Sequence, residues 1–220
     1  MYNKNQKVGV LGSGGVGQVL ASAFLKEGHQ VMLGTRNTSK EQVVNWKNEN
    51  PGAQTGTFAE TAGFGELIIL CVEGNAAQEV IRQAGIENFD GKVVIDTTNP
   101  IAKSAPENGV LKFFTRQNES LMEGLQQMAP GAYFVKAFNS VGNVLMYKPN
   151  FSGVKPSMFI CGNNEEAKET VAGLLDIFGW ETEDMGKIEA ARPIESLCML
   201  WCIPGFLSNQ WTHAFRLLKA

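Results

Sequence analysis

The sequence predicts an α/β protein, a doubly wound and mostly parallel sheet followed by a small C-terminal extension of strands and helices. Short apolar, β-branched runs alternate with segments of helical periodicity, and glycine and proline separate them at short intervals. The 220 residues are 44% hydrophobic and 19% charged, which suits a globular core and excludes global disorder. We therefore expect residues 1–150 to form the main domain and residues 151–220 the extension.

The first part of the chain predicts strand, turn, helix and strand in succession. Val8 to Leu11 is a short apolar strand, and helical spacing follows from Val16 to Gly28. Val31 to Leu33 predicts the second strand. Ser39 is then the expected N-cap of a polar helix that ends near Asn48.

Three further strands are predicted by the apolar runs Leu67 to Val72, Lys92 to Asp96 and Tyr133 to Ala137. Helical spacing from Ala76 to Ala84 and around Ser120 to Met128 places helices between them, so the strands should be parallel. The extension is expected to contain strands at Met158–Cys161 and Thr182–Met185, a helix at Glu165–Phe178 between them, and apolar helices from Arg192.

The strongest signal for function is Gly12-Ser13-Gly14-Gly15-Val16-Gly17, a G-x-G-x-x-G that follows a strand and opens a helix. Gly12 would permit the tight turn, Gly14 the approach of a pyrophosphate, and Gly17 close packing of helix on strand. This context predicts a Rossmann dinucleotide site with phosphate at the helix N-terminus. The alternative is a glycine turn that binds nothing.

The choice of cofactor is predicted by the end of the second strand. NAD enzymes usually place an acidic residue there, but this chain has Gly34-Thr35-Arg36-Asn37. A hydroxyl and a guanidinium suit a ribose 2′-phosphate, so we predict NADP(H) rather than NAD(H). The alternative is that Arg36 is a solvated loop arginine.

Ligands of a doubly wound sheet lie outside the carboxyl ends of the strands, so later loops should line the nicotinamide half. Uncharged donors and acceptors there would suit a carboxamide and riboses, although Asn and Thr also make turns and caps for local reasons. The loops are Val72–Asn75, Thr97–Pro100 and Phe138–Val141, and their candidate residues are Asn75, Thr97, Thr98, Asn99, Pro100, Asn139 and Ser140.

No proton-transfer catalyst is anchored by its sequence context. His29 and His213 are interpreted as structural, and Lys103 and Lys136 are candidates without a supporting pattern. The catalytic residues therefore stay unassigned. A conjugated ring that accepts a hydride needs mainly positioning, so the absence favours a ring acceptor.

The net charge, the hydropathy and the cysteines indicate where the protein is found and what it does not bind. A net charge of −3 gives no electrostatic surplus for nucleic acid, and no apolar run is long enough to span a membrane. We expect a soluble, cytoplasmic protein without a signal peptide. The cysteines should be buried, reduced thiols rather than disulfides or metal ligands. They are Cys71, Cys161, Cys198 and Cys202.

Several stretches together resemble the NADP oxidoreductases that depend on the deazaflavin coenzyme F420. That family is also similar to the cytosolic domain of six-transmembrane metalloreductases. The stretches are VGVLGSGGVG (8–17), VMLGTRN (31–37), VVIDTTNP (93–100), VKAFNS (135–140), FICGNNEEAKETV (159–171) and ARPIESLCMLW (191–201).

The resemblance implies that Ser13 to Val16, Thr35 and Arg36 hold the phosphates and adenosine, with Val72, Asn99 and Asn139 nearer the nicotinamide. It implies hydride transfer between NADPH and a deazaflavin or flavin-like ring. The segment VEGNAAQEV (72–80) lacks the Pro-Trp of the archaeal enzymes, which leaves the acceptor open.

Two alternatives to this enzyme stay open: a non-catalytic NADP(H) sensor or partner subunit, and a keto-acid or imine reductase that uses Lys103 or Lys136. The apolar C-terminal segment also predicts a homodimer. Its apolar residues are Met199, Leu200, Trp201, Phe206, Trp211 and Phe215.

Overall fold

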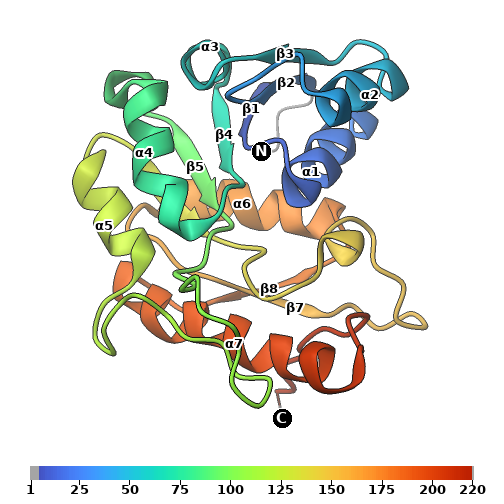
Figure 1. Cartoon of the computed structure of the whole chain (residues 1–220), viewed down its shortest axis with the longest axis vertical. Helices are drawn as coiled ribbons and strands as arrows, with labels where there is room; N and C mark the ends of the chain where they lie inside the picture. Colours follow the sequence, from blue (N-terminus) through green and yellow to red (C-terminus); the bar gives the residue numbers. More distant parts are fainter. Residues whose placement is uncertain (1–4, 220) are drawn as a thin grey trace.

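The computed structural model describes residues 5–219 and contains a six-stranded sheet in the order β3-β2-β1-β4-β5-β6 (Figure 1). All five strand pairs are parallel, which is the Rossmann order and confirms the predicted fold class. The strands are β1 (Lys7–Leu11), β2 (Gln30–Gly34), β3 (Gln54–Gly56), β4 (Leu67–Leu70), β5 (Val93–Asp96) and β6 (Tyr133–Lys136).

Helices cover both faces of this sheet, as continuous apolar strands require. One face carries α1 (Gly15–Lys26), α2 (Glu41–Glu49) and α6 (Glu165–Ile177), and their buried side chains join one core cluster. The other face carries α3 (Phe58–Phe64), α4 (Gly74–Ala84) and α5 (Leu121–Met128), which form a second cluster. Short 3-10 turns lie at Ile86–Phe89, Asn143–Leu145 and Ile188–Ala190.

The structure corrects the prediction between the second and fourth strands. Ser39 does not cap α2, because the helix begins at Glu41 with Lys40 at the N-cap and no side-chain cap. Two elements of this region, β3 and α3, were not predicted from the sequence. Thr57 and Glu60 form a capping box at the start of α3, with each side chain bonded to the other residue's backbone N–H.

The C-terminal part consists of a two-stranded parallel sheet and two long helices. β7 (Ser157–Ile160) and β8 (Glu181–Asp184) flank α6, and α7 (Ala191–Ser208) lies beneath them in Figure 1. A bridge between Lys136 and Cys161 joins this sheet to the end of β6. Residues 215–217 run beside the start of β7, where the Ser157 N–H donates to the carbonyl of Phe215 over 2.9 Å.

The two parts of the chain share one hydrophobic core. Phe178, at the end of α6, is fully buried, and its ring lies 5.1 Å from that of Phe24 in α1 and 6.2 Å from that of Phe138 after β6. The Trp180 indole N–H donates to the Met146 carbonyl over 3.0 Å. Packing is continuous across residue 150. The boundary between two domains at that residue stays a prediction.

The four cysteines are free and buried, as predicted. The predicted apolar C-terminal set divides into two groups. Trp201, Trp211, Phe215 and Met199 pack with Cys198 and Cys202 into a third cluster, whereas Leu200 and Phe206 are exposed on α7. A dimer through α7 stays a prediction. Within residues 5–219, no helix has the length and hydropathy to cross a bilayer.

Because the core is shared, we expect Phe178→Ala to destabilise the whole chain rather than its C-terminal part. Loss of a fully buried phenyl ring should lower the free energy of unfolding by about 3–5 kcal/mol. Urea denaturation followed by far-UV circular dichroism should still show one transition. Leu218→Ala, at a side chain that is 81% exposed, is the control with little expected effect. Two separate transitions would contradict the shared core.

Candidate functional site

The glycine turn after β1 is held against its neighbours by backbone contacts. Gly12 has φ +124°, and a Cβ there would overlap the carbonyl of Cys71, the residue after β4. A Cβ at Gly17 would overlap the carbonyl of Gly12. The Gly12 N–H also donates to the Gly34 carbonyl over 3.0 Å, which ties the turn to β2. The structure thus shows two of the three predicted glycine roles: Gly12 permits the tight turn, and Gly17 permits close packing.

The start of α1 is open. Gly14 is the N-cap, and among the described residues no side chain accepts from the first N–H groups of the helix. A Cβ built on Gly14 would meet no atom within 4 Å, and Gly14 and Gly15 are both exposed. Backbone N–H groups and the positive end of the helix dipole favour an anion at such a terminus. The first turn of α1 can therefore accept a phosphate.

The end of β2 lies beside this turn. Thr35 is buried, and its hydroxyl lies 3.1 Å from the Ser13 hydroxyl, so the glycine turn and the β2 loop are joined. Arg36 and Asn37 are exposed. Asn37 accepts from the Ser39 N–H, which gives Ser39 a turn role in place of the predicted cap. No carboxylate in residues 5–219 pairs with the Arg36 guanidinium, so its charge can meet a ligand.

The loops after β4 and β6 reach this turn, and the loop after β5 packs against the start of α4. A Cβ on Gly74, at the start of α4, would overlap the carbonyl of Asn99. A Cβ on Gly15 would lie 2.9 Å from the side-chain amide of Asn143, after β6. Val72 and Asn99 are half-buried, and Asn75 is exposed in the first turn of α4. Thr98 and Pro100 are buried.

Two asparagines from neighbouring loops form a reciprocal pair. Asn99 Nδ2 donates to the backbone carbonyl of Asn139 over 2.7 Å. Asn139 Nδ2 donates to Asn99 Oδ1 over 3.1 Å and to the Ile194 carbonyl of α7 over 2.8 Å. Asn139 is buried, and its Oδ1 has no hydrogen-bond partner among residues 5–219. An acceptor left buried in this way suits a ligand that brings an N–H group.

Lys136 is fully buried and cannot deliver a proton to a substrate. Its ammonium contacts Asp96 Oδ2 at 2.7 Å, Glu195 Oε1 at 2.8 Å and the Thr98 carbonyl at 2.8 Å, which accounts for its three donors. Burial opposes its charge, but the Asp96 and Glu195 carboxylates raise the pKa of Lys136 above its ordinary value. Of the two lysines considered as catalytic acids, the structure therefore excludes Lys136. The other, Lys103, is exposed.

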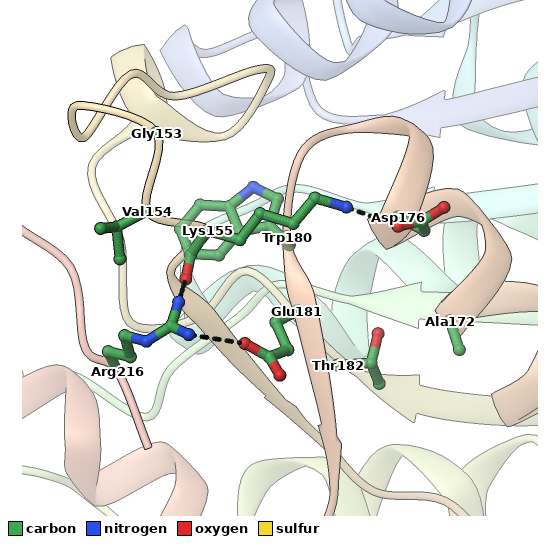
Figure 2. Close-up of a pocket in the computed structure, with 9 residues that line it drawn as sticks. All are labelled: Gly153, Val154, Lys155, Ala172, Asp176, Trp180, Glu181, Thr182 and Arg216. Carbon is green, nitrogen blue, oxygen red and sulfur yellow. Dashed lines mark hydrogen bonds and ion pairs between the residues drawn. The ribbon is translucent and has the colours of Figure 1, made fainter. Parts of the chain in front are cut away.

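A pocket of about 870 Å³ lies elsewhere and contains none of the predicted site residues (Figure 2). Its charged side chains pair with one another: Lys155 with Asp176 at 2.6 Å, and Arg216 with Glu181 at 3.4 Å. Arg216 also donates to the Lys155 carbonyl. Because these charged side chains are paired with one another, the pocket has fewer free charged groups for a ligand. The open turn of α1 is therefore the better candidate site.

The sequence and the fold are similar to those of known proteins. Residues 7–100 match the family described as NADP oxidoreductase, coenzyme F420-dependent. A crystal structure of a proposed F420-dependent NADP reductase from Arthrobacter sp. FB24 is 30% identical and superposes with a TM-score of 0.91. The alignment covers 98% of this chain and 100% of that one, so the similarity extends through α7.

Two longer curated proteins are also similar. Metalloreductase STEAP3 of Rattus norvegicus is 28% identical over 207 residues, which is 92% of this chain and 39% of that protein. The NADPH-dependent reductive aminase of Aspergillus oryzae is 21% identical, over 98% of this chain and 65% of its own length. The chain thus spans about two fifths of the first relative and just under two thirds of the second.

The glycine geometry predicts opposite outcomes for two alanine variants of one turn. Gly17→Ala should lower the free energy of unfolding by about 1–3 kcal/mol, because the added methyl overlaps backbone that cannot move aside. Gly14→Ala should change it by less than about 1 kcal/mol, because the space is open and φ is −76°. Thermal unfolding of both variants beside the unchanged protein measures this. Equal losses would contradict the distinction.

Proposed function

The chain belongs to the family of NADP oxidoreductases dependent on coenzyme F420, and from this premise we propose that it binds NADP(H) and transfers a hydride between NADPH and a ring acceptor. The acceptor we propose is a deazaflavin or flavin-like ring. The observation that carries the proposal is the uncapped glycine turn of α1, joined through Ser13 and Thr35 to the loop of an exposed arginine, Arg36, with which no carboxylate of the described residues pairs. Together they suit a pyrophosphate and a 2′-phosphate on one nucleotide.

The adenosine half would be held at the ends of β1 and β2. The open N–H groups of α1 would bind the pyrophosphate, and Arg36 would form charge-assisted hydrogen bonds with the 2′-phosphate. Ser13 precedes the first turn of α1 and Thr35 precedes Arg36, so the contact between their hydroxyls holds the two loops relative to each other. The absence of an acidic residue at the end of β2 supports NADP(H) over NAD(H).

The nicotinamide half would lie at the ends of β4, β5 and β6. Asn139 Oδ1 is the buried acceptor that a carboxamide N–H would satisfy, and Asn99 holds the Asn139 side chain in place. NADPH, when bound, would supply the hydride. Lys136 has no free donor and the asparagine pair is neutral, so neither would deliver a proton, and the chain's own contribution would be to orient the nucleotide. This supports a ring acceptor over one that needs a protein acid.

We expect Arg36→Ala to lower the affinity for NADPH and to leave that for NADH unchanged. Loss of charged hydrogen bonds to the 2′-phosphate should weaken NADPH binding by about 10- to 100-fold. Fluorescence titration of bound nucleotide measures both affinities. Arg116→Ala, at an arginine whose side chain is 88% exposed, is the matched control. Unchanged NADPH affinity in Arg36→Ala would contradict the NADP(H) assignment.

Anaerobic mixing with NADPH and one oxidised acceptor at a time tests the reaction. We expect loss of NADPH absorbance with a deazaflavin or a free flavin. Hydride transfer between two stacked rings needs mainly their correct positioning and no acidic side chain from the protein. A quinone and a small imine serve as comparison acceptors. Tight NADPH binding without turnover of any of them would contradict the enzyme and favour the NADP(H) sensor.

A further inference from the structure

Three buried charges meet at the carboxyl ends of β5 and β6. Asp96, Lys136 and Glu195 are each no more than 1% exposed, and Lys136 bonds both carboxylates. We call these residues the ion triad. Glu195 comes from α7, so the triad joins the C-terminal helix to the main sheet. None of the three side chains has a role in the proposed hydride transfer, although they lie directly behind residues that do.

The triad is saturated with hydrogen bonds inside the protein. Asp96 Oδ1 accepts from the Thr98 N–H over 2.9 Å and from the Thr98 hydroxyl over 2.7 Å. The two Glu195 oxygens accept from the N–H groups of Leu121 and Met122, at the start of α5, over 2.9 and 3.1 Å. The ammonium of Lys136 has three acceptors. The triad therefore has no donor left for a ligand and can act on one only through its neighbours.

Those neighbours are the backbone groups that hold the asparagine pair. Asp96 binds the N–H of Thr98 and Lys136 binds its carbonyl, so the peptide units on both sides of Thr98 are fixed just before Asn99. Asn139 donates to the carbonyl of Ile194, the residue before Glu195. The placement of both asparagine side chains thus depends on backbone that the triad fixes.

Packing alone does not explain three buried charges. A buried ion pair seldom stabilises a fold more than apolar residues of similar volume would, because removing charges from water is costly. What such a network can add is one defined geometry. We propose that Lys136, held by Asp96 and Glu195, is a positioning residue that fixes the Asn99–Asn139 pair for the nicotinamide end of the nucleotide, an inference that rests on the proposed function.

The double variant Asp96→Asn, Lys136→Met tests this at constant net charge, and leaves Glu195 without its cationic partner. It removes one negative and one positive charge, so the formal charge of the triad does not change. Asn can still accept from Thr98, and Glu195 keeps its two bonds to α5. The bond to the Thr98 carbonyl is lost. A second variant, Glu195→Gln, weakens the tie to α7 and provides the same readout if the first does not fold.

The readout compares two ligands by isothermal titration calorimetry. NADP⁺ carries the nicotinamide, whereas adenosine 2′,5′-bisphosphate carries the 2′-phosphate without it. In each variant we expect NADP⁺ affinity to fall about tenfold, the equivalent of one hydrogen bond, with no change for the bisphosphate. Arg192→Gln is the control, because Arg192 also joins α7 to α5, through Glu123 at 2.6 Å, without touching Thr98 or Asn139. It should leave both affinities unchanged.

Three results would overturn the proposal. If both ligands weaken together, the triad is a structural tie with no specific effect on the nicotinamide end. If neither affinity changes in a folded variant, the triad does not position the asparagine pair, while the proposed function stands. If the unchanged protein binds the bisphosphate but gains nothing from the nicotinamide half, the proposed function fails and this inference fails with it.

Discussion

The backbone contact between the glycine turn and β4 is the constraint on which the rest of the site depends. Gly12 lies against the carbonyl of Cys71, and Gly17 against that of Gly12, so no side chain separates β1, β4 and the start of α1. The strand order also changes direction between β1 and β4, which is where an open α/β sheet forms its ligand crevice. The uncapped amides of α1 and the loops after β2, β5 and β6 follow from that geometry.

Much of this architecture could be predicted because its determinants are local. The apolar runs of β1, β4 and β5 are continuous, and alternation with helical spacing predicts parallel pairing. β3 was missed because Gln54-Thr55-Gly56 contains no apolar residue and pairs only with β2. α3 could have been found, since Thr57 and Glu60 have the spacing of a capping box before an apolar segment.

The candidate site also has a part that could be predicted and a part that could not. The glycine motif and the end of β2 are each one short stretch of sequence, and each was predicted from its own residues. The ion triad was not, because Lys136 lies 40 residues from Asp96 and Glu195 is brought to it only by the path of α7. One signal was present in the sequence: Lys136 stands within the apolar run from Phe134 to Phe138. A charged residue in such a run is expected to be buried and therefore to require a partner.

The triad joins the C-terminal helix to the main sheet. The family match covers residues 7–100, whereas the similarity to the Arthrobacter structure covers 98% of the chain and so includes α7. Through Ile194 and Glu195, α7 reaches the carboxyl ends of β5 and β6, and Glu195 places its charge at the N-terminus of α5, where the helix dipole favours it. A change in α7 therefore acts on the asparagine pair without touching the glycine turn of α1.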